Sequence, residues 1–224
     1  HFFQRAIMGG TRVRCASVQY YRVRSQRYPL ARHEIRHFGI QGSNTTIRRQ
    51  SRRTGMKIAV DARSLATIPM TGVGYYTFSF LEALAQVKGR YSVDILLFTS
   101  GSSVSRPLLD IASKLPFQHR HIRVPNKLLN LWFASGVWPG IEAFLPRYDA
   151  LWMPNLNFVS RQQDTPLYVT VHDLSFLHNE RFYSVKNRLW HRLLNIRRLL
   201  ASATLLFAVS HHTAADIKRF FPDL

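Results

Sequence analysis

The chain has 224 residues, enough for one sizeable domain with or without a tail, and its 46% hydrophobic content favours a buried core over a disordered chain. A single cysteine, Cys15, excludes an internal disulfide framework and a cysteine-based zinc cage. The longest apolar runs, such as 205–209, are far shorter than the roughly 20 residues that span a bilayer.

The formal net charge of +19 is distributed unevenly along the chain. Residues 1–55 hold 12 arginines, no lysine and one acid, Glu34, and carry +11, whereas residues 56–224 carry +8. At Met56 the composition changes abruptly to a buried-strand pattern. We interpret 1–55 as translated upstream sequence, largely disordered with at most a short strand or helix. A targeting segment or a basic arm that binds nucleic acid are the alternatives.

Downstream of Met56, short apolar runs alternate with stretches of helical periodicity. Continuous apolar strands alternating with amphipathic helices predict an α/β fold, a doubly wound, Rossmann-like parallel sheet with helices on both faces. The expected strands are 58–60, 93–99, 121–124, 150–153, 167–171 and 204–209. The expected helices are 75–87, 128–145 with an interruption near 138–140, 185–201 and 213–221.

Such a sheet binds ligands at the carboxyl ends of its strands, where the strand order reverses. The segments that follow the predicted strands should therefore converge in space. They are residues 61–74, 154–158, 172–176 and 210–213.

A glycine-containing segment, Thr71-Gly72-Val73-Gly74, joins the first strand to the first helix. Glycines let a ligand approach the backbone, and the amide groups at a helix N-terminus favour phosphate. Thr77 stands where a dinucleotide fingerprint would need a third glycine, and no Gly-Lys-Ser/Thr follows to make a Walker loop. An ordinary strand-to-helix turn is the alternative.

Two further strand ends carry polar groups. His172 and Asp173 follow the fifth strand, where the imidazole could contact a sugar hydroxyl or phosphate, or the pair could cap the strand and order the loop. Ser210 follows the sixth strand at a helix start, where capping is the default role and ligand contact an additional one.

In order and spacing, these segments resemble the N-terminal domain of family-4 glycosyltransferases, retaining enzymes of the GT-B architecture, many of them mannosyltransferases that serve polysaccharide biosynthesis. The resemblance covers residues 56–224. It implies transfer of a hexose, with mannose a candidate, from a GDP- or UDP-linked sugar to a glycan or polyprenyl-phosphate-linked acceptor. The residues that carry it are Asp61-Ala62-Arg63, Gly72-Val73-Gly74-Tyr75-Tyr76, Val171-His172-Asp173-Leu174-Ser175-Phe176 and Val209-Ser210.

The resemblance also implies a role for each matching residue. Gly72, Val73 and Gly74 would face the donor diphosphate, His172 would contact the transferred sugar, and Asp173 would support that histidine. Ser210, Tyr75 and Asn155 would shape the acceptor side.

In the family, the donor nucleotide is held mainly by a second α/β domain, with paired glutamates, a lysine and an arginine that we do not find in this sequence. We therefore expect this chain alone to show little or no turnover, because those groups neutralise the leaving diphosphate. The resemblance implies no cofactor and no metal. His211 and His212 depart from the family pattern, and we do not expect them to bind a metal together because adjacent helical positions diverge by about 100°.

The predicted helix 185–201 has an apolar stripe formed by Leu189, Leu193, Ile196 and Leu200, which Trp190 and Leu194 widen. Its basic residues are Lys186, Arg188, Arg192, Arg197 and Arg198. It is either an ordinary packed helix with a solvated face or a surface for anionic lipid or acceptor head groups. Most of the aromatic residues Trp132, Phe133 and Trp138 are expected in the core, with an interfacial patch as the alternative. The expected location is the cytoplasm, with peripheral contact at the inner membrane surface as a further expectation.

Three other classes compete with this hypothesis. A non-catalytic module that binds a sugar phosphate or acceptor fits the same residues. A nucleic-acid-binding protein fits the total charge, but most of that charge lies in the tail, and we expect no nucleic-acid partner. A nicotinamide-dependent dehydrogenase fits the fold but lacks the third glycine of the fingerprint.

Overall fold

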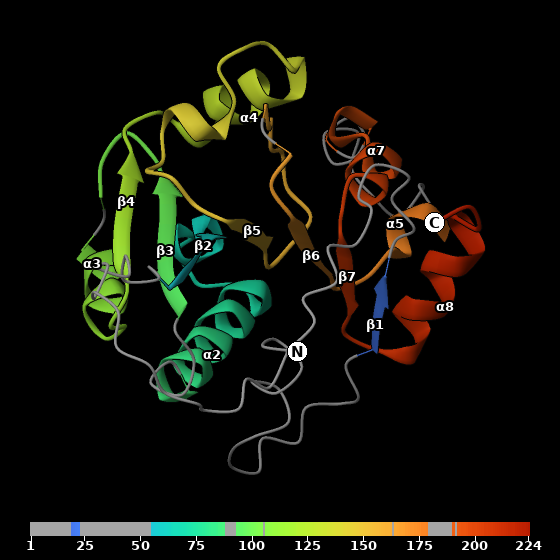
Figure 1. The fold of residues 1–224 in the computed structure, drawn as a ribbon, viewed down its shortest axis with the longest axis horizontal. Coiled ribbons are helices and arrows are strands. Elements are labelled where there is room, and N and C mark those ends of the chain that lie inside the picture. The colour runs from blue at the N-terminus through green and yellow to red at the C-terminus, as the bar shows by residue number, and fades with distance from the viewer. Residues whose placement is uncertain are drawn as a thin grey trace, which may run out of the picture.

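The computed structural model describes residues 19–22, 55–87, 93–104, 106–162, 164–178, 190 and 192–224. Its centre is one seven-stranded sheet in the order β1-β7-β6-β5-β2-β3-β4 (Figure 1). The strands are β1 (Gln19–Arg22), β2 (Met56–Asp61), β3 (Val93–Ser100), β4 (Gln118–Ile122), β5 (Ala150–Met153), β6 (Leu167–Val171) and β7 (Leu205–Ala208).

Strands β2 to β7 pair in parallel, and β1 pairs antiparallel with β7 at one edge. Apart from β1, the chain runs outward from β2 in one direction and then outward from β5 in the other, which is the Rossmann order. The reversal between β2 and β5 is the switch point at which such sheets bind ligands. The predicted doubly wound α/β fold is therefore confirmed.

Helices cover both faces of the sheet. They are α2 (Gly72–Val87), α3 (Arg106–Ser113), α4 (Asn126–Ser135), α5 (Ser175–His178), α7 (Ile196–Ala201) and α8 (His211–Phe220), with the short 3-10 turns η1 (Arg63–Ala66) and η3 (Ile141–Ala143). Figure 1 shows α5, α7 and α8 grouped beside β7, whereas α2 and α3 lie on the other side of the molecule.

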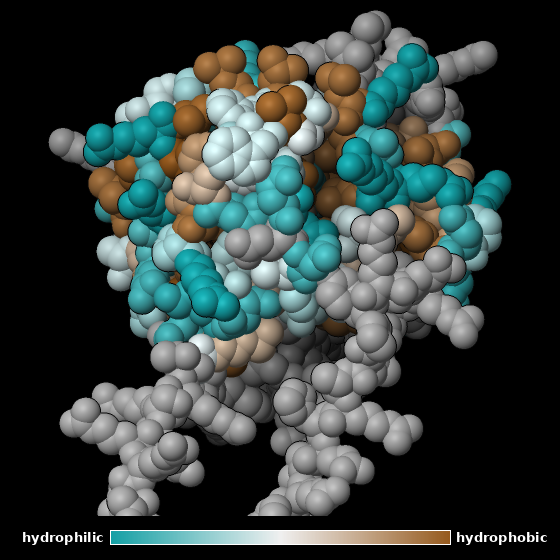
Figure 2. Space-filling view, turned by 45° about the horizontal axis from the view of Figure 1, so that its top comes forward, coloured by the Kyte–Doolittle hydropathy of each residue, from teal (hydrophilic) through white to brown (hydrophobic). Residues whose placement is uncertain are grey.

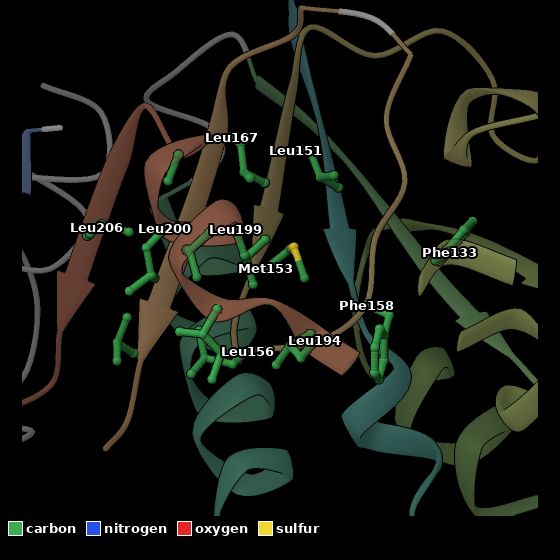
Figure 3. Packing of buried hydrophobic residues seen from close by; sticks show 14 of the residues in the cluster. Phe133, Leu151, Met153, Leu156, Phe158, Leu167, Leu194, Leu199, Leu200 and Leu206 are labelled. Atoms are coloured by element: carbon green, nitrogen blue, oxygen red, sulfur yellow. The ribbon is translucent and has the colours of Figure 1, made fainter. Parts of the chain in front are cut away.

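The core consists of two clusters, because successive side chains of a strand point to opposite faces. Ile58 and Val60 pack with α2 and α3, whereas Ala59 between them packs with α4, α7 and α8. In the cluster that contains Ala59, Leu199 and Leu200 of α7 lie over the side chains of β5, β6 and β7 (Figure 3). The buried strands thus contribute to both clusters, as predicted for a sheet that helices cover on both faces.

One predicted helix ends earlier than its periodicity indicated, and another is interrupted although it ends at Ala201 as predicted. Gly136 stops α4 because it adopts the left-handed conformation at φ 67° and its N–H bonds the Phe133 carbonyl at 3.3 Å. Asn195, at φ 45°, separates α7 from the helical residues 192–194 and caps α7 by accepting a hydrogen bond from the Arg198 N–H. The predicted stripe is wrong at Leu193, which is 50% exposed, whereas the neighbouring Leu194 is buried.

Other boundaries differ by a few residues. Strand β4 is Gln118–Ile122 rather than 121–124, since four of the five residues of this edge strand are polar and it has no apolar run. Helix α2 begins at Gly72, so Gly72, Val73 and Gly74 are its first turn rather than a loop. Helices α3 and α5 were not predicted. Of the N-terminal segment 1–54, the structure describes only the strand β1, so the expected disorder of the rest lies outside the described residues.

Candidate functional site at the switch point

The four segments predicted to converge are joined by direct contacts. Asn157 donates to the Asp61 carboxylate at 3.4 Å, and His172 Nε2 lies 2.9 Å from the Pro154 carbonyl oxygen. Thr213 Oγ1 donates to the His172 carbonyl at 2.9 Å. These contacts link the ends of β2, β5, β6 and β7, so the predicted convergence is confirmed.

A pocket of about 800 Å³ opens between the ends of β2 and β5. Its lining includes Asp61 from the end of β2, Val73 from the first turn of α2, and Asn155 and Asn157 from the segment after β5. The pocket therefore lies at the switch point, beside the amide end of a sixteen-residue helix. Polar side chains and a helix N-terminus suit a hydroxylated, negatively charged ligand.

Asp61 and Arg63 form a buried ion pair on the floor of this site, with side chains 5% and 4% exposed. The pair is bidentate, with Arg63 Nη2 at 2.6 Å from Asp61 Oδ2 and Nε at 2.9 Å from Oδ1. The guanidinium also donates to Asn130 Oδ1 at 3.0 Å and to the Phe158 carbonyl at 2.7 Å. One side chain thus fixes the end of β2 against α4 and the segment after β5.

The first turn of α2 is capped from Thr71. The Thr71 hydroxyl accepts from the Gly74 N–H at 3.3 Å, and its carbonyl accepts from the Tyr75 N–H at 3.0 Å. Within the part of the chain that the structure describes, the amides of Gly72 and Val73 have no protein partner. Since Val73 lines the pocket, its amide is available to an anion there, and that of Gly72 precedes it in the same turn.

The two glycines of this turn differ in what surrounds them. A Cβ on Gly74 would lie 2.5 Å from Met70 Cγ and 3.1 Å from the Ser64 carbonyl oxygen, so this glycine allows η1 and α2 to pack closely. A Cβ on Gly72 would meet no atom within 4 Å. Gly74 therefore has a packing role, and Gly72 faces open space.

His172 is half-buried between the segment after β5 and α2. Its ring makes a T-shaped contact with that of Tyr76, with 4.8 Å between ring centroids. Burial lowers the pKa of His172, and the Pro154 carbonyl and the charge of Asp173 offset part of that shift. Because a carbonyl oxygen only accepts, Nε2 carries the proton and Nδ1 is the acceptor nitrogen of a neutral imidazole.

Asp173 does not support His172 in the way that the resemblance implied. Its Oδ1 accepts from the Ser175 hydroxyl at 2.6 Å and from the Ser175 N–H at 3.1 Å, which caps the start of α5. Asp173 acts on His172 through its charge alone. These bonds order the loop after β6, which agrees with the loop-ordering alternative for this residue.

Ser210 caps α8, since its Oγ accepts from the Thr213 N–H at 3.1 Å. We expect Ser210→Ala to lower the free energy of unfolding by about 1 kcal/mol, as for other N-cap removals. Urea denaturation followed by circular dichroism measures this. Asp223, which pairs with Arg197 at an exposed site, offers the control, because Asp223→Ala should change stability by less than about 0.5 kcal/mol.

The remaining predicted site residues do not all lie at the switch-point pocket. Tyr75 is 62% exposed and is not part of the pocket lining, whereas Asn155 lines it. Lys186 and Arg188 lie outside the described residues. Arg192 is exposed and, with Arg198, lines a second pocket of about 520 Å³ between α4, the segment after β5 and α7.

Sequence reasoning missed the roles of Arg63, Tyr76 and Asn157. Arg63 and Tyr76 stood inside recognised motifs, yet their partners lie far away in the sequence, such as Phe158 at 95 residues from Arg63. Asn157 lies in a segment expected to converge, and it lines both pockets. An amide side chain directly after a strand was the signal that could have identified it.

Two histidines should make stability depend on pH. Burial lowers the pKa of His119, with the neighbouring His121 adding to the shift, and burial lowers that of His172. Between the folded pKa and the unfolded value of about 6.5, the unfolded chain binds more protons, so stability is lost as the pH falls through this window. Urea denaturation at pH 7.5 and 5.5 should show the loss, and His119→Gln should reduce it. An unchanged pH dependence in that variant would contradict the assignment.

No helix in the described part of the chain is long and apolar enough to cross a membrane. Comparison with known families gives one match, in which the model for Glycosyltransferase Family 4 covers residues 70–223. That range contains the α2 amide end, His172 and Ser210. Searches of the curated proteins and of the solved structures found no match.

Proposed function

Since the chain belongs to glycosyltransferase family 4, we propose that it forms the acceptor-side domain of a retaining enzyme that moves a hexose from a nucleotide sugar. Mannose from a GDP-linked donor is our first candidate, and a UDP-linked hexose the second. The observation that supports this most is the α2 amide end at the switch-point pocket. The neutral His172 lies beside this pocket rather than in its lining, and its Nε2 is bonded to the carbonyl of Pro154, the residue before the lining residue Asn155.

In this proposal, the amides of Gly72 and Val73 face the donor diphosphate, and His172 Nδ1 accepts a hydrogen bond from a hydroxyl of the transferred sugar. A neutral imidazole suits this role because an uncharged acceptor nitrogen can receive the hydroxyl proton. Burial favours that neutral form at physiological pH.

The pocket alone is poorly equipped to stabilise a leaving diphosphate. Of the described residues that line it, Arg63 alone is cationic, and its guanidinium is already paired with Asp61. Phosphate leaving groups need unpaired cationic or hydrogen-bonding groups in the transition state. We therefore propose that the chain alone turns over little or no donor and that further cationic groups complete the site.

The second pocket supports an anionic acceptor. Arg192 and Arg198 line it, and Asn157 belongs to both pockets, so the two cavities adjoin. A polyprenyl-phosphate-linked acceptor could place its phosphate near these arginines and its sugar toward His172. Arginine suits phosphate because its guanidinium donates two parallel hydrogen bonds.

Exposed apolar side chains on and after α4 support peripheral contact with a membrane. Leu128, Leu131, Val137 and Trp138 are 58 to 75% exposed, and Trp132 is 41% exposed. Phe133, which was grouped with them in the sequence, is a core residue. Hydrophobic side chains reach the surface on the part of the molecule that carries α4 (Figure 2). Amphipathic surfaces of this kind bind the interface of anionic bilayers, where a lipid-linked acceptor would lie.

The test is binding of the sugar by ligand-observed NMR, with methyl mannoside, GDP-mannose and UDP-glucose as probes. We expect His172→Ala to weaken sugar binding by about two- to tenfold, the value of one hydrogen bond. His121→Ala is the matched control, because His121 is also half-buried but lies on the edge strand β4. Equal sugar signals from both variants would refute the role of His172, and measurable transfer by the chain alone would refute the proposed inactivity.

A non-catalytic acceptor-binding module is the second candidate, favoured by the absence of an unpaired cation among the described residues of the first pocket. The same titration, extended to a polyprenyl-phosphate-linked sugar as the acceptor, separates the two functions. A module of this kind would bind the acceptor without any nucleotide sugar, whereas the acceptor domain of an enzyme should also show weak donor signals.

A further inference from the structure

Three potential metal ligands from two helices lie together outside the site described above. His178 ends α5, whereas His212 and Asp216 belong to α8. His178 Nε2 lies 2.8 Å from Asp216 Oδ1, and His212 Nε2 lies 3.6 Å from Asp216 Oδ2. One donor atom from each of the three residues falls within 4.8 Å of the others. Figure 1 shows α5 and α8 side by side near the C-terminus.

The helices hold these side chains in place. His212 and Asp216 are four residues apart, and this spacing puts them on one face of α8. The His178 ring is fixed by an edge contact with Phe220 at 4.8 Å between centroids, and it stacks on His212 at 6.2 Å. The Asp216 side chain is 6% exposed, whereas that of His212 is 83% exposed. A buried carboxylate thus faces two imidazoles that solvent can reach.

We propose that His178, His212 and Asp216 bind a divalent transition-metal ion of the Zn²⁺ type. Zinc lies 2.0–2.2 Å from imidazole nitrogen and carboxylate oxygen, so tetrahedral ligand atoms are about 3.4 Å apart. The observed separations bracket that value, and small rotations of the exposed imidazoles suffice to reach it. Two imidazoles favour zinc over Mg²⁺ and Ca²⁺, which prefer oxygen ligands.

This site differs from the one that the sequence analysis rejected. His211 and His212 point apart as adjacent helical residues do, and the second imidazole comes instead from α5. His178 lies 38 residues from Asp216 in the sequence, so the spacing carries no motif. Only the packing of α5 on α8 brings the three ligands together.

The ion would connect the two helices that follow the site segments. Helix α5 comes directly after His172 and Asp173, and α8 begins after Ser210. The bond from Thr213 Oγ1 to the His172 carbonyl already joins these segments. Bound zinc would add a second connection at the outer ends of the same elements and stabilise the folded chain, because it binds only the assembled group.

The experiment titrates the full chain, free of any affinity tag, with ZnCl₂ by calorimetry, and follows thermal unfolding with and without the ion. We expect the wild type to bind one Zn²⁺ at this group and to melt at a higher temperature with zinc. His178→Ala and His212→Ala should each weaken binding by more than about tenfold, since even loss of a partner beyond the ligands costs that much. His211→Ala, one residue away on α8, is the matched control and should keep the wild-type affinity.

Replacement by Co²⁺ adds a spectroscopic test, because the visible absorption of bound cobalt reports its ligands. His212→Ala should fold normally, since its side chain is 83% exposed. Wild-type zinc affinity in that variant, or no zinc binding by the wild type, would show that the three residues form an ion pair only. A stabilisation by Mg²⁺ equal to that by Zn²⁺ would likewise overturn the proposal.

Discussion

Replacing Arg63 by alanine should lower the free energy of unfolding by about 3–5 kcal/mol, the cost of breaking a buried ion pair from one side. The loss leaves the Asp61 carboxylate 5% exposed without its bidentate partner. It also leaves Asn130 Oδ1 and the Phe158 carbonyl without their donor. Because typical domains are stable by about 5–15 kcal/mol, this single change removes a large fraction of the total.

Urea denaturation of the wild type and variant measures the effect. Arg63→Lys serves as the second variant. It keeps the charge but loses the bidentate geometry, so its free energy of unfolding should fall less than that of Arg63→Ala. The double variant Asp61→Leu, Arg63→Met removes both charges and should recover much of the stability that Arg63→Ala loses. If Arg63→Ala costs less than about 1 kcal/mol, the Asp61–Arg63 ion pair is not a main stabilising contact at the switch point.

Alanine at Gly74 should destabilise the protein by about 1–3 kcal/mol, whereas alanine at Gly72 should be nearly neutral. The new methyl at position 74 would meet Met70 Cγ at 2.5 Å and the Ser64 carbonyl at 3.1 Å, and the backbone atom has little freedom to move. The gain in helix propensity, at most about 1 kcal/mol, offsets only part of this. At position 72 the methyl enters open space.

Thermal and urea unfolding of the two variants give the comparison directly. Comparing the two variants also separates effects on stability from effects on ligand binding. Gly72→Ala should fold like the wild type and lose nucleotide-sugar affinity only if the diphosphate comes close to that Cα. Equal destabilisation of the two variants would mean that the two glycines do not differ in packing as described.

The sheet was predictable because its strands are short continuous apolar runs. β2, β5, β6 and β7 were each placed within about two residues, since burial on both faces leaves no other pattern for these segments. β4 was misplaced because it is an edge strand with polar side chains at four of its five positions. The helix ends at Gly136 and Asn195 depend on left-handed backbone positions, which periodicity does not encode.

The candidate site was predictable only as a set of segments. Strand ends of a parallel sheet meet at one edge whatever their sequence, so the convergence of His172, Asn155 and Ser210 followed from the fold. The partners of individual side chains did not follow from the fold in this way. Asp173 lies next to His172 yet caps α5, and Arg63 pairs across 67 and 95 residues of sequence. Such contacts come from tertiary packing, which no local pattern encodes.

The arginine-rich N-terminal segment contributes β1, which hydrogen-bonds along the outer side of β7. In a chain shortened to begin at Met56, β7 would become an outermost strand, with a row of unpaired amide and carbonyl groups along Leu205–Ala208. Exposed strand edges of this kind pair with other chains. The segment that we interpreted as translated upstream sequence therefore covers this edge, and its removal should favour dimers and aggregates at high protein concentration.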